Sequence, residues 1–130
     1  MKIVLLNPLE VEDQIIESHK EKLEELGHEF IAYDDNASSD DEIIERLDGA
    51  DAAIITNKPL SKKVIEASKD LELIDVAFTG VDHIDLDAVK DNGITLLNAS
   101  GYSDDSVAEL VIGLTIGVLR KFNENNANIF

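Results

Sequence analysis

Residues with amide, hydroxyl and ammonium groups stand directly after the short apolar runs of this sequence. The stretches that carry them contribute Asn57, Lys58, Phe78, Thr79, Gly80, Val81 and Asn98. Backbone N–H groups around Gly80, the amide of Asn98 and the single cation of Lys58 can together hold a small carboxylate. We therefore predict that a small organic acid binds where these residues meet, and we assign no catalytic residue and no metal ligand.

A structural role is the alternative for each of these residues. Gly80 can permit a tight turn, Asn98 can cap a loop, and Lys58 can be a solvated loop lysine. The functional hypothesis therefore depends on the fold bringing the residues to one place.

The sequence lacks the residues that several common kinds of functional site require. A phosphoacceptor receiver domain requires acids after its first and third strands and a lysine after its fifth, where this sequence has Asn7-Pro8, Asn57 and Asn98. The stretch after the first apolar run has no glycine for a flavin phosphate loop, and no G-x-G-x-x-G fingerprint occurs. Because the sequence contains no cysteine, disulfides, thiolate zinc sites, Fe–S clusters and cysteine nucleophiles are excluded.

The net charge of −17 over 130 residues disfavours nucleic-acid and anionic-membrane partners, because both reward clusters of Lys and Arg. A hydrophobic share of 44% is enough for a folded core. The N-terminus lacks the apolar run of a signal peptide, and the run Val107–Leu119 is interrupted by Glu109 and too short for a membrane span. We therefore expect a cytoplasmic protein.

Five short apolar runs alternate with helical patterns, which is typical of βαβ units and a parallel sheet. The predicted strands are Lys2–Leu6, Glu29–Tyr33, Ala52–Ile55, Leu73–Phe78 and Ile94–Leu97. The predicted helices cover residues 10–26, 39–49, 62–68, 85–90 and 107–122. Right-handed crossovers favour a flavodoxin-like, doubly wound α/β domain of three layers, with five parallel strands in the order 2-1-3-4-5. Ligands bind such sheets at the carboxyl ends of the strands, which is where the candidate residues lie.

The last predicted helix carries apolar residues on most of its sides. Ser106 and Glu109 form a capping box, so we expect the helix over residues 106–122. We predict an interdomain or dimer interface on one face, formed by Val107, Leu110, Val111, Leu114 and Val118. The predicted domain covers residues 1–122, and residues 123–130 are predicted to be a frayed tail.

The second half of the sequence combines the strand-turn pattern FTGVDHIDL, a short helix ending DNGI, a strand ending at Asn98, and SVAELV opening the last helix. This combination resembles the substrate domain of the D-isomer-specific 2-hydroxyacid dehydrogenases. The segment ITNKPLSKKVIEA is similar to the third-strand segment of the glycerate or hydroxypyruvate reductase branch. The resemblance covers most of Ala52–Lys121, whereas residues 1–50 match in pattern only.

This resemblance implies the substrate domain of an enzyme that interconverts 2-hydroxy acids and 2-oxo acids. In the family, the turn spelled here Phe78–Val81 binds the substrate carboxylate through its backbone, and Asn98 matches a position near the substrate and the nicotinamide. The helix that begins at Ser106 leads into an NAD-binding Rossmann domain and contributes to the dimer interface. The family's catalytic Arg, Glu and His lie in or beyond that second domain, which we expect to be absent from this chain.

We therefore expect a truncated or isolated domain that binds no cofactor and is inactive alone, with NAD(H) or NADP(H) serving the full-length parent. The expected partners are a small 2-oxo or 2-hydroxy acid and a second copy of the chain. The last helix then either packs on its own sheet or is exchanged within a homodimer. The alternative is a non-enzymatic, flavodoxin-like module whose activity is self-association.

Overall fold

A computed structural model describes residues 1–122 and residue 124. Contacts between residues divide the chain into two units, one spanning Met1–Ala99 and one beginning at Ser100. The domain predicted over residues 1–122 spans both units, and its extent stays a prediction. The tail predicted over residues 123–130 lies outside the described residues except for Glu124.

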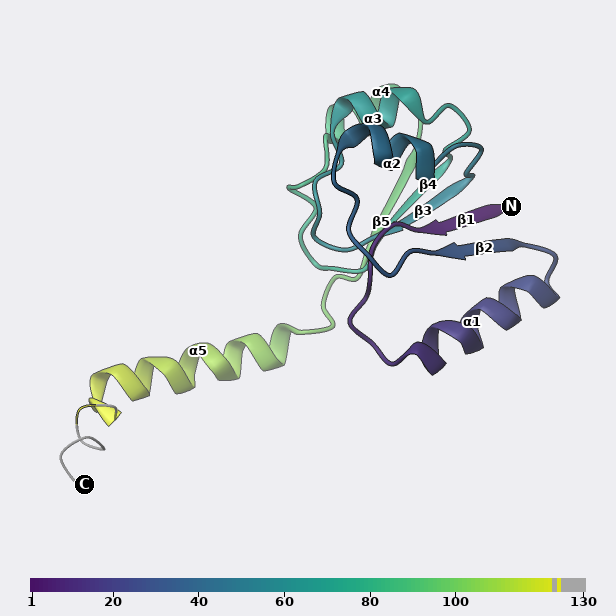
Figure 1. Ribbon diagram of the computed structural model, residues 1–130. Helices are drawn as coiled ribbons and strands as arrows, with labels where there is room; N and C mark the ends of the chain where they lie inside the picture. Colours follow the sequence, from purple (N-terminus) through teal and green to yellow (C-terminus); the bar gives the residue numbers. More distant parts are fainter. Residues whose placement is uncertain (123, 125–130) are drawn as a thin grey trace. The chain divides into compact units, whose positions relative to one another are not determined.

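The first unit is built on a five-stranded parallel sheet. Its strands are β1 (Lys2–Leu5), β2 (Glu29–Ala32), β3 (Ala52–Ile55), β4 (Leu73–Val76) and β5 (Thr95–Asn98). They lie in the order β2-β1-β3-β4-β5, which confirms the predicted doubly wound topology (Figure 1). Ile3 on the interior strand β1 lies beside Phe30 on one side and Ala52 on the other.

Three of the strands end earlier than predicted. In each case the next residue still donates its backbone N–H to the neighbouring strand. Leu6 donates its N–H to the Ile54 carbonyl at 3.0 Å, and Tyr33 donates to the Leu5 carbonyl at 3.0 Å. After β4 the last such bond runs from the Ala77 N–H to the Ile55 carbonyl, at 2.8 Å. Phe78 therefore belongs to the turn that follows β4 and not to the strand.

Four helices accompany the sheet of the first unit: α1 (Asp13–Glu25), α2 (Asp40–Arg46), α3 (Lys62–Ala67) and α4 (Leu86–Asp91). Helices α2, α3 and α4 gather on one face, and α1 lies on the other (Figure 1). The side chains that begin α2, α3 and α4 each accept a backbone N–H from the first turn, and they are Ser39, Ser61 and Asp85. These caps set where the helices begin and therefore how long the preceding loops are.

The hydrophobic core lies between the sheet and helices α2 to α4. Its most completely buried side chains include Val4, Leu47, Ile55, Val64 and Ile74. Alternate residues of each strand face this core, as expected for strands that carry a covering layer. Helix α1 contributes no buried residue and begins at Asp13, three residues later than predicted, after Glu10 adopts a left-handed backbone conformation (φ 55°).

The second unit contains α5 (Asp104–Leu119). The helix begins before the predicted cap at Ser106, because Asp104 and Asp105 place two carboxylates at its N-terminus, where the helix dipole favours negative charge. Ser106 therefore lies inside the helix, and Ser103 takes the N-cap position without a side-chain hydrogen bond.

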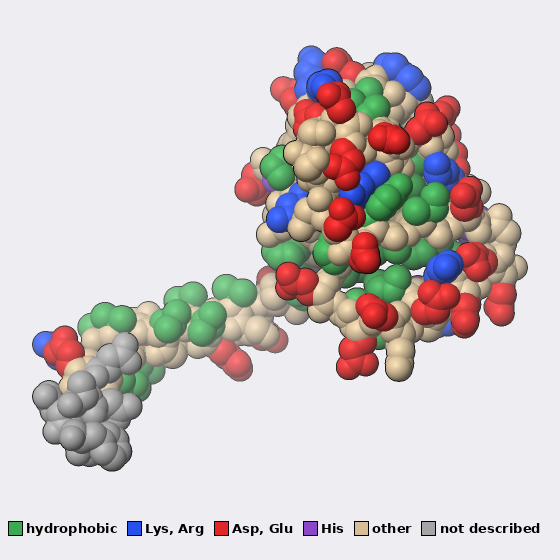
Figure 2. Space-filling model, viewed as in Figure 1, with side chains coloured by type: hydrophobic (Ala, Val, Ile, Leu, Met, Phe, Trp, Pro, Cys, Tyr) green, Lys and Arg blue, Asp and Glu red, His purple; other side chains and the backbone are tan. Residues whose placement is uncertain are grey.

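Apolar side chains cover several sides of α5, as Figure 2 shows along its length. The side chains of the predicted interface are exposed within this unit, namely Val107, Leu110, Val111, Leu114 and Val118. Their role as an interface stays a prediction. In the described part of the chain, no helix is long and apolar enough to cross a membrane.

Candidate functional site

The turn after β4 presents backbone N–H groups at the carboxyl edge of the sheet. Within the described residues, the N–H groups of Thr79, Gly80 and Val81 have no hydrogen-bond acceptor in the protein. Thr79 and Gly80 are exposed and Val81 is half-buried, so these three donors lie in the outer layer of the molecule. Successive backbone N–H groups without a protein acceptor can donate to an anionic oxygen.

Two bonds from the end of β5 hold this turn in place. The Asn98 amide donates through Nδ2 to the Thr79 carbonyl at 2.7 Å. The Ala99 N–H is shared between the carbonyls of Val76 and Phe78, each at 3.1 Å. Asn98 is therefore next to the turn, as the sequence predicts, but one N–H of its amide is committed to fixing the turn. Its Oδ1 and the second N–H of Nδ2 have no partner within the described residues and are left to face a ligand.

A second pair of bonds ties the turn to the loop after β3. The Leu60 N–H donates to the His83 carbonyl at 3.0 Å, and the Asp85 N–H donates to the Leu60 carbonyl at 3.2 Å. The two loops that carry candidate residues are thereby held side by side. The Nε2 atom of His83 is buried and has no hydrogen-bond partner among the described residues.

The loop after β3 places Asn57 and Lys58 in solvent. Both side chains are exposed, and neither has a hydrogen bond or an ion pair within the described residues. They line one cavity of about 220 Å³ together with Phe78, whose side chain is 42% exposed. We call this space the edge cavity; its other lining residues are Pro8, Leu9, Glu10, Asn36 and Thr56.

Two predicted groups of residues thus come together, while part of the set stays apart. Asn57, Lys58 and Phe78 share the edge cavity, but Asn98 and the turn residues after Phe78 do not line it. The role of these residues in substrate binding therefore stays a prediction.

Asn7 has a structural role that sequence reasoning missed. It is 3% exposed, and its amide exchanges two hydrogen bonds with Thr56 on the neighbouring strand end. Nδ2 donates to Thr56 Oγ1 at 3.0 Å, and Oδ1 accepts from the Thr56 N–H at 3.2 Å. Because both ends of its amide bond to Thr56 and its side chain is buried, Asn7 holds the segments after β1 and β3 together.

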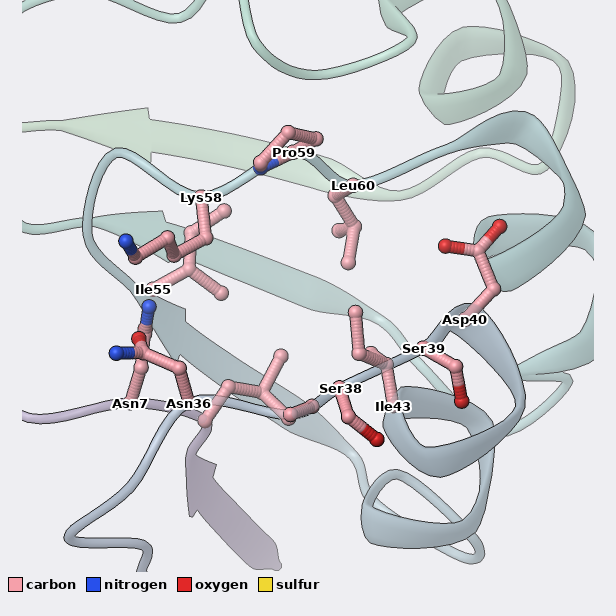
Figure 3. Close-up of a pocket in the computed structure, with 12 residues that line it drawn as sticks. Asn7, Asn36, Ser38, Ser39, Asp40, Ile43, Ile55, Lys58, Pro59 and Leu60 are labelled. Atoms are coloured by element: carbon pink, nitrogen blue, oxygen red, sulfur yellow. The ribbon is translucent and has the colours of Figure 1, made fainter.

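A larger cavity of about 300 Å³ lies next to the edge cavity, where α2 begins. We call it the α2 cavity. Figure 3 shows Ile43 and Leu60 pointing toward each other across it, with Lys58, Asn7 and Asn36 together at one end. Apolar and polar side chains both line it, with Asp40 among the polar ones, and both cavities are lined by Lys58 and Asn36.

The buried guanidinium of Arg46 supports the wall between α2 and the sheet. Its side chain is 6% exposed and forms ion pairs with Asp35 and Glu42. It also donates to the Leu6 carbonyl at 3.2 Å, and it lies 4.1 Å from the centre of the Tyr33 ring. No sequence motif marks this cluster, because Arg46 and Leu6 lie far apart in the sequence.

Glu42 completes the same cluster at the start of α2. The Ser38 backbone N–H, the Ser38 hydroxyl and Arg46 all donate to its carboxylate, and they lower the pKa of Glu42 from 4.5 to about 2. The carboxylate therefore stays ionised at neutral pH and holds the loop that lines the α2 cavity. In the described residues, no group of three or more His, Cys, Asp or Glu side chains could hold a metal ion.

Comparison with known proteins links this geometry to one family. Residues 3–128 match the model of the D-isomer specific 2-hydroxyacid dehydrogenase, catalytic domain. Glycerate dehydrogenase of Methylorubrum extorquens is 39% identical over 93 residues, which cover 72% of this chain and 29% of that protein. D-3-phosphoglycerate dehydrogenase of Methanocaldococcus jannaschii is 32% identical over 130 residues, which cover 99% of this chain and 23% of that protein.

Solved structures give the same result for the fold. An acyclic imino acid reductase (Bsp5), in complex with NADPH and D-Arg, matches with a TM-score of 0.85 and 31% identity, over 99% of this chain and 40% of that one. An NAD-dependent formate dehydrogenase from Staphylococcus aureus, in complex with NAD, matches with a TM-score of 0.81 and 31% identity, over 97% and 40%. The chain therefore spans less than half the length of these relatives.

Proposed function

The chain belongs to the D-isomer-specific 2-hydroxyacid dehydrogenase family, and we propose on this basis that it is the substrate-binding part of an enzyme interconverting 2-hydroxy and 2-oxo acids. The observation that carries this proposal is the row of free N–H groups at Thr79, Gly80 and Val81. A substrate carboxylate accepts hydrogen bonds from these donors. The turn is preorganised, because Asn98 and Ala99 already hold it from the neighbouring strand.

Neighbouring residues complete the proposed site. Lys58 supplies a positive charge toward the substrate anion, since it has no other ion-pair partner within the described residues. Asn57 and Phe78 line the edge cavity beside it, and Phe78 offers an apolar surface for the carbon atoms of the substrate. Asn98 acts by positioning the turn; its Oδ1 accepts from a substrate hydroxyl, or its second Nδ2 hydrogen is donated to an oxo group.

Hydride transfer needs groups that residues 1–130 do not supply. The family resemblance assigns NAD(H) or NADP(H) and the catalytic Arg, Glu and His to a second domain, and relatives are much longer than this chain. We propose that residues 1–130 alone bind the acid, bind no cofactor and do not oxidise NADH with glyoxylate, hydroxypyruvate or pyruvate. The catalytic step then belongs to the complete two-domain enzyme.

Binding of glycolate, followed by two-dimensional ¹H–¹⁵N NMR, tests the substrate site. We expect the amide signals of Thr79, Gly80 and Val81 to shift in a saturable manner. Asn98→Asp removes the donor to Thr79 and adds a negative charge beside the turn, so binding should weaken at least about tenfold. Asn92→Asp is the matched control, because the Asn92 amide also donates to a backbone carbonyl, that of Ala88 at 2.9 Å, away from the turn.

An unchanged spectrum at saturating glycolate would overturn the proposal, and so would equal losses in the two Asn variants. A second candidate function is self-association through α5, which its exposed apolar side chains favour. We propose a homodimer in which this helix is covered, either by exchange or by face-to-face packing. Light scattering at several protein concentrations distinguishes a dimer from a monomer, and the glycolate experiment decides independently whether the dimer also binds an acid.

A further inference from the structure

The α2 cavity combines a patch of apolar side chains with a cation, Lys58, at one end and a carboxylate, Asp40, at the other. The Asp40 carboxylate accepts from the Ser61 hydroxyl at 2.6 Å. Ile43 and Leu60 point into it from opposite sides, and Leu6 and Ile55 add further apolar lining (Figure 3). Lys58 lies at the end where the Asn36 side chain is found. A cavity of about 300 Å³ built in this way suits a hydrocarbon group whose parent molecule carries one negative charge near Lys58.

This space is adjacent to the proposed substrate site. Lys58 and Asn36 line both cavities, and the edge cavity reaches Phe78, the first residue of the N–H-lined turn. The shared lining runs from Phe78 past Lys58 to the side chains beside Ile43. A 2-hydroxy acid bound next to Phe78 can extend its substituent along this lining.

The charges at this edge act against a second anionic group on the substrate. Glu10 lines the edge cavity. The Asp82 carboxylate lies close to Gly80, since one of its oxygens would be 3.1 Å from a Cβ atom added to that glycine. The other nearby cation, Arg46, is occupied by Asp35 and Glu42. A phosphate dianion requires several Arg or Lys donors, whereas Lys58 alone can balance one carboxylate.

We propose that this site selects 2-hydroxy or 2-oxo acids with an uncharged apolar substituent, which the α2 cavity takes up, over acids that carry a phosphate. The inference rests on the proposed function, because it takes the turn at Gly80 as the carboxylate site. It goes further in naming the substrate class, since relatives in this family include phosphoglycerate dehydrogenases.

NMR titration of the purified chain, with ¹⁵N amides and ¹³C-labelled methyl groups, tests the selection. The probes are glycolate, D-2-hydroxy-4-methylpentanoate, whose substituent is an isobutyl group, and 3-phosphoglycerate. We expect all bound acids to shift the Gly80 amide, but only the isobutyl acid to shift the methyl signals of Ile43 and Leu60. That acid should bind at least about tenfold more tightly than glycolate, and 3-phosphoglycerate more weakly than glycolate.

Two neighbouring residues of α2 provide a filled-cavity variant and its control. Ile43→Phe places a ring in the α2 cavity and should reduce the affinity for the isobutyl acid to that of glycolate. Ile44→Phe makes the same change at a half-buried residue that does not line the cavity, and should leave both affinities unchanged.

The carboxylate site and the substrate class are tested by different outcomes. If glycolate leaves the Gly80 amide unshifted, the proposed carboxylate site is wrong. If glycolate shifts that amide but the isobutyl acid binds no more tightly and leaves the Ile43 methyl signal in place, the site stands and the substrate class is wrong. Preferential binding of 3-phosphoglycerate would overturn the substrate class as well.

Discussion

Replacing Arg46 by methionine should be among the most destabilising single changes in the first unit. The guanidinium is 6% exposed and donates to the carbonyls of Leu6 and Asp35, at 3.2 and 3.1 Å. Methionine keeps much of the apolar stem but cannot donate. The Leu6 carbonyl, whose bond to Arg46 is buried, would be left without that donor.

The loss of unfolding free energy depends on which hydrogen-bond partners of Arg46 can bond to water after the substitution. The Asp35 and Glu42 side chains are 63% and 33% exposed, so loss of these two ion pairs costs about 0–1 kcal/mol each. Desolvation of the Leu6 carbonyl without a donor costs about 1–3 kcal/mol. We therefore expect Arg46→Met to lower the free energy of unfolding by about 1–5 kcal/mol.

Urea denaturation followed by circular dichroism measures this change. Lys63→Met is the control, because it removes an ion pair with Asp41 whose two side chains are 59% and 81% exposed, and it should cost no more than about 1 kcal/mol. Arg46→Lys should fall between the two, since it retains the charge but fewer donors. Equal losses for Arg46→Met and Lys63→Met would refute the reasoning, because the buried carbonyl would then contribute nothing.

Three further predictions concern charge and association. Asp82→Asn should tighten glycolate binding about threefold at low ionic strength, with a smaller gain in high salt, as measured by NMR titration. The lowered pKa of Glu42 means that its contribution to stability is complete above pH 4.5 and is lost as the pH falls toward 2. The difference in unfolding free energy between the wild type and Glu42→Gln should therefore shrink over that range, and a constant difference would contradict the role of Ser38. Leu114→Glu and Val118→Glu on α5 should each convert the proposed homodimer to a monomer in light scattering, without changing the urea midpoint of the first unit.

The sheet was predictable because local sequence patterns determine it. Apolar runs separated by caps fix the strand order once right-handed crossovers are required, and the predicted span Ala52–Ile55 agrees with β3 at both ends. The caps at Ser39, Ser61 and Asp85 are local in the same sense, since each accepts from a residue three positions later. The start of α5 was placed too late, because the capping-box pattern at Ser106 outweighed the acids before it.

Features that depend on long-range contacts could not be read from the sequence. Arg46 finds its buried acceptor at Leu6, and Asn7 finds both of its partners on Thr56. The candidate residues were placed correctly at the carboxyl edge, because every parallel strand ends there. That the Asn98 amide donates to Thr79 could not be foreseen, since the direction of a side chain depends on the tertiary structure.

The interior position of β1, between β2 and β3, has a consequence for how the molecule folds during synthesis. Ile3 pairs with β2 on one edge and with β3 on the other. β1 is synthesised first, but its second neighbour, β3, is synthesised only after β2 and α2. Any nascent chain that stops before Ile55 carries β1 with one bare edge, which other chains can extend. The chain between β1 and β3 must lose conformational entropy before the two strands can pair. This cost favours slow folding. The strand order thus sets the shortest N-terminal fragment in which β1 is paired on both edges, and that fragment must reach through β3.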